Sequence, residues 1–476
     1  MIAIFNQSAL QRVEVHMGQD VIEVRTANDI AASTPNTASL TINTLSGPRH
    51  RYILLVLLAA YTLSFLDRQV VTILAEAIKK DLHISNLQLG MLTGLAFAIF
   101  YTFLGIPIAR LAERHSRPLI VAVSMALWSA FTLLSGRATS FGVMGLARLG
   151  VGFGEAGCNP CAHSMIADIT PPEKRASALA FYSLGVPIGT MLGLILGGVI
   201  ADEYGWRVAF MVAGAPGLLL AAITVITIKE PRAQRADDSE TYASSRPSFQ
   251  QTLKELRGKR TFWQIAVAAG LIAFVGYGQA AFGTPFFLRV HGREVIDLAH
   301  GFRLGPQGFL GIAGALTTGL GGLAGTWLGG FLADRAAVRD KRAYMSVPAI
   351  AGLVSLPFIY LIYTVQSSAV ALALGSIPAL LNTLWFGPVY ATAQSVVSSQ
   401  SRTTTAAILL FVLNTIGLGF GPMSFGALND LLIGPAFDLG ETEGIRWAII
   451  SASSVILVSV GLFWWARETV LEDIVS

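Results

Sequence analysis

The feature that constrains this chain most is a series of long apolar runs, which recur from residue 52 almost to the C-terminus. Each run has about 20 residues, the length that a helix needs to cross the hydrocarbon core of a bilayer. The strands of a membrane β-barrel would be about half as long and would alternate apolar and polar residues, and no such alternation is found. We expect twelve spans, near 52–77, 87–111, 118–136, 141–166, 175–201, 207–228, 262–288, 305–333, 344–365, 369–397, 403–432 and 445–466. The sequence therefore predicts an all-α integral membrane protein.

Composition supports the membrane class and argues against other classes. Only 13% of residues are charged, against about 25% in a typical soluble domain. The net charge is +4, but the basic residues lie between apolar runs and form no stripe that would suit nucleic acid. Cys158 and Cys161 form a CxxC inside the fourth span, without a second pair to complete a zinc site. We expect them to be small packing residues, and we expect no metal and no cofactor.

Lys and Arg residues predict the orientation of the spans. If both termini are cytoplasmic, the segments on that side hold most of the 33 Lys and Arg residues, as the positive-inside rule requires. We therefore expect a multi-pass protein of the cell (inner) membrane with both termini inside. Residues 1–48 contain no apolar run of the signal-peptide type and are expected to form a disordered cytoplasmic tail.

A polar segment divides the spans six and six. We expect a six-helix bundle at 49–228, a cytoplasmic linker at 229–260 and a second six-helix bundle at 261–476. In the linker, Phe249, Leu253 and Leu256 recur at spacings of four and three, which predicts a short amphipathic helix on the cytoplasmic surface. Paired six-span halves are a transporter architecture.

Four ionisable residues lie inside two of the predicted spans, where charge is costly and usually faces a protein interior or a water-filled path. Arg148 and Glu155 are seven residues apart, about two helical turns, and so share one face. Asp67 and Arg68 lie in the first span, and Asp67 is predicted at nearly the depth of Arg148, within about 5 Å. Asp67 can therefore meet Arg148, while Arg68 reaches into a cavity or towards Glu155. The alternative to a functional cluster is a static set of salt bridges between two helices.

Several segments resemble the major facilitator superfamily. GFLADR at 330–335 matches the G-x-L-x-D-R loop motif of that superfamily, whereas its first-half counterpart carries Arg110 and Glu113 near the usual Asp-Arg position. FLDRQV, RLGVGFGEAGCNP and PPEKRASALAFYSLGVPIG are similar to the Spinster, or sphingolipid-transporter-like, branch, with a bacterial member expected. The resemblance covers about 50–470. It implies two six-helix bundles around a central cavity, alternating access, and transport of lipid-like amphiphiles such as lysophospholipids or sphingoid phosphates, often coupled to protons.

The residues themselves suggest roles within such a transporter. Glu155 is the best candidate for a proton carrier, because burial favours a neutral carboxyl group while a nearby arginine favours a charged one. Charged residues at span ends are candidates for a cytoplasmic gate, or alternatively for simple anchoring: Arg110, Glu113, Arg114, Asp334 and Arg335. Polar residues in second-half spans could line the cavity or make interhelical hydrogen bonds: Tyr277, Gln279, Asn382, Trp385, Tyr390 and Asn414.

The sequence thus favours a proton-coupled secondary transporter of an amphipathic or lipid-like substrate, expected to act as a monomer. A transporter of small organic anions or drugs, or an uncoupled facilitator, is the alternative. A membrane enzyme would need a nucleophile–base pair or a metal cluster, and His163 is the only histidine inside a predicted span. An ATP-driven pump is not expected, since the chain has no GxxxxGK[ST] run.

Overall fold

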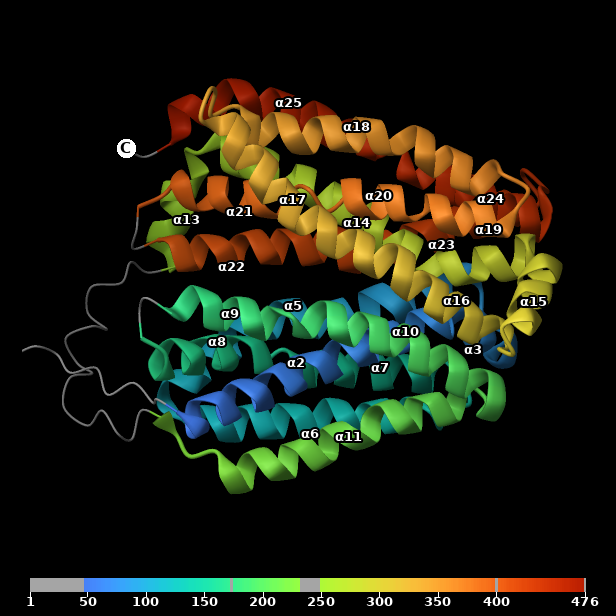
Figure 1. Cartoon of the computed structure of the whole chain (residues 1–476), viewed down its shortest axis with the longest axis horizontal. Helices are drawn as coiled ribbons and strands as arrows, with labels where there is room; N and C mark the ends of the chain where they lie inside the picture. The colour runs from blue at the N-terminus through green and yellow to red at the C-terminus, as the bar shows by residue number, and fades with distance from the viewer. Residues whose placement is uncertain (1–46, 172–173, 232–248, 399–400, 475–476) are drawn as a thin grey trace, which may run out of the picture. The chain divides into compact units, whose positions relative to one another are not determined.

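The computed structural model describes residues 47–171, 174–231, 249–398 and 401–474. The predicted tail at 1–48 lies almost wholly outside these ranges, as does much of the linker. The described ranges contain helices and no strand. Residues Thr44–Ser476 form one compact unit, and Figure 1 shows its helices running side by side.

The helices fall into two halves, each built from long apolar segments. The first half contains α2 (Pro48–Ile73), α3 (Ala75–Leu82), α4 (Asn86–Gly90), the π-helix η1 (Met91–Leu95), α5 (Ala96–Arg114), α6 (Arg117–Ser135), α7 (Phe141–Glu155), α8 (Cys158–Ile169), α9 (Arg175–Ser183), α10 (Gly185–Tyr204) and α11 (Trp206–Thr227). The short helix α13 (Phe249–Arg257) precedes the second half. The second half contains α14 (Arg260–Val290), α15 (Gly292–Gly301), α16 (Pro306–Gly314), the π-helix η4 (Ala315–Gly319), α17 (Leu320–Ala337), α18 (Ala343–Thr364), α19 (Ser368–Leu374), α20 (Ser376–Leu381), α21 (Phe386–Ser395), α22 (Arg402–Leu413), the π-helix η5 (Asn414–Phe420), α23 (Gly421–Ile433), α24 (Gly440–Ser453) and α25 (Ile456–Asp473).

Eleven helices of the described ranges are long and apolar enough to cross a membrane. The predicted fourth span is the exception, because it forms two helices, α7 and α8, that are separated at Ala156 and Gly157. Its length was expected from the apolar run, but the break was not. Together α7 and α8 supply the twelfth crossing, and the break immediately follows Glu155.

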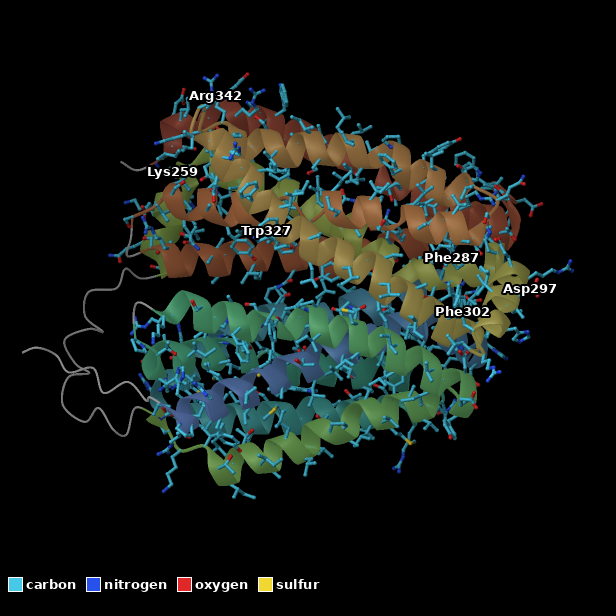
Figure 2. The ribbon with its side chains drawn as sticks, in the orientation of Figure 1. Lys259, Phe287, Asp297, Phe302, Trp327 and Arg342 are labelled. Atoms are coloured by element: carbon cyan, nitrogen blue, oxygen red, sulfur yellow. The ribbon has the colours of Figure 1, made fainter. Side chains whose placement is uncertain are left out.

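The two ends of the unit can be named by the short helices that they carry. The α13 end contains α13 and the start of α2, and the α15 end contains α3 and α15 (Figure 1). Lys259 and Arg342 lie at the α13 end, whereas Asp297 and Phe302 lie at the α15 end (Figure 2).

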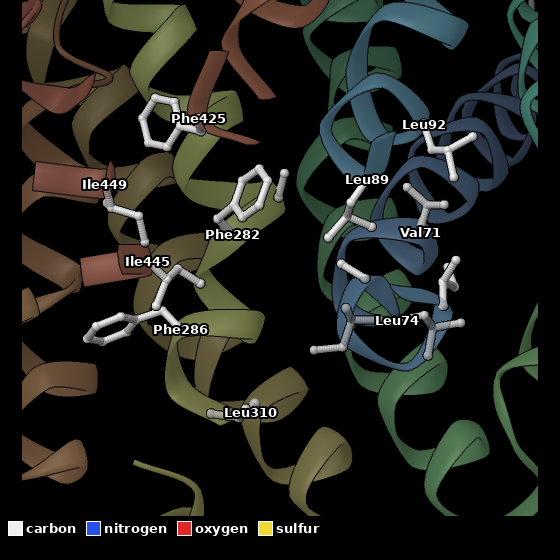
Figure 3. Packing of buried hydrophobic residues seen from close by; sticks show 14 of the residues in the cluster. Val71, Leu74, Leu89, Leu92, Phe282, Phe286, Leu310, Phe425, Ile445 and Ile449 are labelled. Atoms are coloured by element: carbon white, nitrogen blue, oxygen red, sulfur yellow. The ribbon is translucent and has the colours of Figure 1, made fainter. Parts of the chain in front are cut away.

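The buried side chains show that the halves share a hydrophobic core at the α15 end. One hydrophobic core there contains residues of both halves, including Leu74 and Leu89 from the first and Phe286 and Phe425 from the second (Figure 3). The other two cores are separate. One belongs to the first half, with only Leu418 contributed as a buried residue from the second, and the other belongs to α13 and the second half. The halves therefore pack together at the α15 end and keep separate cores towards the α13 end.

Glycines allow the helices of the two halves to approach closely. A Cβ at Gly90 would collide with the backbone of Pro422, and one at Gly311 with the backbone of Leu194. These contacts join α4 to α23 and α10 to α16. Such small residues are what permits close backbone packing in membrane proteins. The π-helices η1 and η5 meet at the next level, where Gly94 faces the Leu418 carbonyl group.

The predicted amphipathic helix corresponds to α13, and it packs on protein. Leu256 is fully buried in the second-half core, and Leu253 packs against that core. Glu255 accepts hydrogen bonds from the Ser398 backbone N–H (2.8 Å) and the Ser401 hydroxyl (2.7 Å). Burial raises the pKa of Glu255, but these hydrogen bonds outweigh it and the net pKa is lowered. The helix is thus fixed to the second half by both apolar and polar contacts.

Candidate functional site

The first element of the site is a buried ion pair between α2 and α7. The Arg148 guanidinium donates to Asp67 Oδ2 at 3.1 Å, and both side chains are almost fully buried, at 1% and 2% exposure. The hydroxyl of Thr132 on α6 donates to the other Asp67 oxygen at 2.6 Å. The pairing expected from the two depths is confirmed, and the Asp67 carboxylate links three helices of the first half.

The second element is the pair formed by Arg68 and Glu155. Arg68 donates to Glu155 Oε2 through Nε at 2.8 Å and through Nη2 at 2.6 Å. The hydroxyl of Ser64, one turn earlier on α2, donates to the same oxygen at 2.6 Å. Arg68 is the less buried of the four charged residues, with 12% of its side chain exposed. The structure thus brings all four predicted residues together as two ion pairs, Asp67–Arg148 and Arg68–Glu155.

Three donors converge on one oxygen of Glu155, and the other oxygen has none. Glu155 Oε1 is buried and has no hydrogen-bond partner among the described residues. Buried polar atoms are normally hydrogen-bonded, so an orphaned carboxylate oxygen needs an explanation. A proton on Oε1 would leave the three existing hydrogen bonds in place. Oε1 is therefore the atom where this carboxyl group can accept a proton.

Glycines in α7 explain how the charged residues reach this depth. A Cβ at Gly154 would collide with Trp128 of α6, and one at Gly152 with the Phe97 carbonyl group of α5. The α7 backbone therefore lies directly against its neighbours, and Arg148 and Glu155 are enclosed within the half.

Aromatic rings surround the Arg68 guanidinium, a feature that the sequence analysis missed. The Arg68 Cζ atom lies 4.7 Å from the ring centre of Phe65, 4.6 Å from that of Phe97 and 4.4 Å from that of Tyr101. Contacts of this kind stabilise a cation by about 0.5–2 kcal/mol each, more when desolvated. Phe65 lies three residues before Arg68 on α2, which was the available signal; Phe97 and Tyr101 come from α5 and could not be assigned. The rings can hold the cation when its carboxylate partner is neutralised.

The predicted second-half residues have different surroundings. Tyr277 packs against the first-half core, on the side of Arg68, and Tyr390 is half-buried beside the second-half core. Gln279 donates to the Ser453 hydroxyl at 3.1 Å, an interhelical hydrogen bond. Trp385 is buried and stacked on Phe386. Asn414 begins η5, and Asn382, between α20 and α21, has a buried side-chain oxygen with no hydrogen-bond partner among the described residues.

The predicted gate residues lie at the α13 end, where the halves have separate hydrophobic cores. Arg110, Arg114 and Arg335 are exposed, and the side chain of Glu113 lies outside the described part of the structure. Asp334 accepts a hydrogen bond from the Tyr344 hydroxyl at 2.8 Å, within the second half. A gating role for these residues belongs to another conformation and stays a prediction.

Arg117, the first residue of α6, has a structural role. Its side chain is fully buried and bridges Asp168 and Glu230, each at 2.6 Å. It also donates to the Ser164 hydroxyl at 2.7 Å. Arg117 therefore ties α6, α8 and the segment after α11 together at the α13 end of the first half.

A polar network that the sequence analysis missed joins the halves at the α15 end. Arg289, the penultimate residue of α14, donates to Glu76 Oε2 at 2.7 and 2.9 Å and to the Asn86 side-chain oxygen at 3.0 Å. Asp430 of α23 accepts from the Asn86 side chain at 2.7 Å and from the Leu87 backbone N–H at 2.7 Å. We call Glu76, Asn86, Arg289 and Asp430 the α15-end network. Because Glu76 and Asn86 are in the first half, every one of these contacts crosses between the halves.

Breaking the Asp67–Arg148 pair is expected to destabilise the protein strongly. In Arg148→Met the Asp67 carboxylate remains buried without its cation. The loss of one partner of a buried pair lowers the free energy of unfolding by about 3–5 kcal/mol. The double variant Asp67→Asn/Arg148→Met is expected to recover much of that loss, because no unpaired charge remains. Thermal unfolding in detergent measures both. The control is Arg207→Met. The side chains of Arg207 and of its partner Asp81 are 39% and 42% exposed, and such an exposed ion pair adds about 0–1 kcal/mol to the free energy of unfolding. An Arg148→Met protein as stable as the control would contradict this account.

Comparison with known proteins fits this geometry. The family model for the Major Facilitator Superfamily matches residues 57–422. A crystal structure of a bacterial homolog to the human lysosomal transporter Spinster, inward-facing and unoccupied, is similar with a TM-score of 0.81 and 30% identity, covering 91% of this chain and all of that one. The MFS-type efflux pump of Mycolicibacterium smegmatis is 29% identical over 90% of this chain and 96% of its own length. The sphingosine-1-phosphate transporter SPNS2 of Danio rerio is 28% identical over 78% of this chain and 74% of its own. The chain belongs to the Major Facilitator Superfamily, a superfamily of membrane transporters, and to its Spinster-like branch.

Proposed function

We propose that the protein is a proton-coupled secondary transporter that moves an amphipathic, lipid-like substrate by alternating access. The observation that carries the proposal is the Arg68–Glu155 pair, with an orphaned carboxylate oxygen and a partly exposed guanidinium. A cation that can exchange one anionic partner for another, beside a group that can take a proton, is the minimum that coupling requires.

The coupling follows from competition for Arg68. While Glu155 is charged, its carboxylate occupies the guanidinium. When Glu155 takes a proton on Oε1, the attraction between the two groups falls, and an anionic head group can replace it. Proton binding at Glu155 therefore favours anion binding at Arg68. The surrounding rings of Phe65, Phe97 and Tyr101 keep the guanidinium in place during the exchange.

The distribution of charge supports an inward-facing state with the α13 end in the cytoplasm. Basic side chains such as Lys259 and Arg342 lie at this end (Figure 2), as the positive-inside rule expects. The halves have separate hydrophobic cores at this end and share one core at the α15 end. We place both termini in the cytoplasm and the protein in the cell membrane.

The contrast between the halves favours an amphiphile as substrate. The four buried charges of the site, Asp67, Arg68, Arg148 and Glu155, belong to the first half, whereas the second half presents Tyr277 and Tyr390. A polar head group can bind the first half while an apolar chain contacts the second. The similarity to a sphingosine-1-phosphate transporter supports this class. The similarity to an efflux pump supports the alternative, a transporter of small organic anions or drugs.

Transport by the purified protein in proteoliposomes tests the proposal. We expect a lysophospholipid to be transported faster when a pH gradient is imposed, and a protonophore to remove the difference. Transport of small organic anions in place of the lipid would favour the alternative substrate class. Lipid transport that ignores the gradient would make the protein an uncoupled facilitator.

A further inference from the structure

A polar strip leads from the Arg68–Glu155 pair towards the α13 end. Asn159 and His163 are four residues apart on α8 and so share one face. The opposite face carries the buried residues Cys158, Cys161 and Met165, which belong to the first-half core. His163 follows Glu155 by eight residues and lies beyond the break at Ala156 and Gly157, towards the α13 end.

Hydrogen bonds and ring stacking fix the position of Asn159 in the middle of this strip. The Tyr182 hydroxyl donates to Asn159 Oδ1 at 2.6 Å, and the Tyr182 ring is fully buried and stacked on Tyr61 with a centroid distance of 4.5 Å. Asn159 Nδ2 in turn donates to the Tyr101 hydroxyl at 3.4 Å. The Tyr101 ring is one of those around Arg68. A continuous chain of contacts therefore connects Arg68 to Tyr182.

His163 lies at the far end of this series of contacts, next to Tyr182. Its ring meets Tyr182 edge-on, with a centroid distance of 5.5 Å and an angle of 89°. The side chain is exposed, and neither ring nitrogen has a hydrogen-bond partner within the described ranges. An ionisable side chain at membrane depth usually faces a water-filled path. The helices that pack most on α8 are α2, α5, α6 and α9, all of the first half, so its exposed face is turned away from that half's core.

Other polar groups near the strip already have ion-pair or hydrogen-bond partners. Arg68 is bonded to Glu155, Arg117 to Asp168 and Glu230, and the Tyr182 hydroxyl to Asn159. The imidazole of His163 is thus an exposed hydrogen-bond donor without a partner among the described residues of this strip. An imidazole N–H that faces a water-filled path can donate to an anionic group, and hydrogen bonds to charged groups are roughly twice as strong as those between neutral groups.

We propose that His163, whose ring packs edge-on against Tyr182, is an entry subsite for the anionic, phosphate-type head group of the substrate. This inference rests on the proposed function and adds a second binding site for the head group. The head group binds the His163 N–H while Glu155 still occupies Arg68. It passes deeper, to Arg68, when Glu155 is protonated. His163 therefore sets the preference for phosphate-bearing over neutral lipids, and it acts before the coupling step.

Two substitutions separate this role from simple packing against Tyr182. His163→Phe keeps a ring that can meet Tyr182 edge-on but removes both nitrogens. His163→Gln loses the ring but keeps a hydrogen-bond donor. A subsite predicts that the Gln variant works and the Phe variant fails, whereas a packing role predicts the reverse. Because the side chain is exposed, neither substitution is expected to impair folding.

The experiment is equilibrium binding to the full chain in lipid nanodiscs, with three probes. The probes are a lysophosphatidic acid, a monoacylglycerol of the same chain length, and inorganic phosphate. For lysophosphatidic acid we expect about tenfold weaker binding by His163→Phe, the loss of one hydrogen bond to a charged group, and binding within about twofold of wild type by His163→Gln. Monoacylglycerol binding is expected to be the same in all three proteins. In transport, the Phe variant should raise the half-saturating concentration and leave the maximal rate within about twofold.

Each other outcome is decisive. Equal binding of lysophosphatidic acid by wild type and His163→Phe would overturn the subsite while leaving the proposed function intact, and so would equal weakening in both variants. A wild type that binds monoacylglycerol as tightly as lysophosphatidic acid would overturn the proposed substrate class itself. Binding of inorganic phosphate with the same dependence on His163 and comparable affinity would show that the site serves a free anion, not a lipid.

Discussion

Replacing Glu155 with glutamine is expected to abolish transport driven by a pH gradient. Glutamine has nearly the same shape, and its side-chain oxygen can still accept the hydrogen bonds from Ser64 and Arg68 that Glu155 Oε2 accepts. It cannot take a proton on the atom that corresponds to Oε1. The variant should therefore behave as a permanently protonated carrier. Binding of an anionic substrate should become tighter, because the carboxylate no longer competes for Arg68, and it should lose its dependence on pH.

Three measurements in proteoliposomes and nanodiscs separate these effects. Accumulation against a gradient should fall to the level of empty liposomes, while exchange of labelled for unlabelled substrate persists. Binding of lysophosphatidic acid should be tighter than in wild type at neutral pH. The control is Glu468→Gln, which removes an exposed carboxylate of α25 and should change nothing. A Glu155→Gln protein that retains full gradient-driven uptake would reduce the pair to a structural tie between α2 and α7.

Arg289→Gln is expected to shift the protein towards a state that is open at the α15 end. Arg289 makes two hydrogen bonds to Glu76 and one to Asn86, all across the halves, and Arg289 and Glu76 are only 5% and 4% exposed. Removing the cation leaves Glu76 buried, with only the exposed Lys80 at 3.4 Å. Loss of one partner of a buried pair costs about 3–5 kcal/mol. Since 1.4 kcal/mol is a factor of ten, the closed state should lose at least about two orders of magnitude in population relative to the open one.

Spin labels at His83 and Phe437 report this change. Both positions are exposed, at the tips that follow α3 and α23, and the two native cysteines are buried and can be replaced. In wild type the distance between the two labels should be mainly the short one of the closed α15 end. In Arg289→Gln the distance between the labels should be longer. The matched control is Arg207→Gln, because Arg207 pairs with Asp81 within the first half and does not bridge the halves. If both variants gave the wild-type distance distribution, the α15-end network would not be what keeps this end closed.

The two predictions depend on the sequence to different degrees. Asp67, Arg68, Arg148 and Glu155 could be found from the sequence because a charge inside an apolar run is conspicuous. The pairing of Asp67 with Arg148 followed from helical rise and depth, whereas Arg68 was left between a cavity and Glu155. Glu76 lies near the end of the first predicted span, but nothing in the sequence pointed to its partner. It is buried against Arg289, 213 residues away.

The same contrast holds within the site. The predicted fourth span was continuous, whereas α7 ends at Glu155 and α8 begins at Cys158. Hydropathy reports that a segment is apolar, but it does not report whether its backbone hydrogen bonds continue. His163 was visible only as a histidine inside a span. Its neighbours Tyr182 and Tyr101 come from α9 and α5, and no periodicity in α8 could name them.

The sequence by itself determined the membrane class, the two sets of six spans and the four buried charges. These follow from local quantities: the length of an apolar run, the rise of a helix and the cost of charge in hydrocarbon. Only the tertiary structure decided which end is closed, which rings surround Arg68 and which carboxylate oxygen is free. Those depend on how helices distant in sequence approach one another, and that is set by glycine contacts and side-chain packing across the halves.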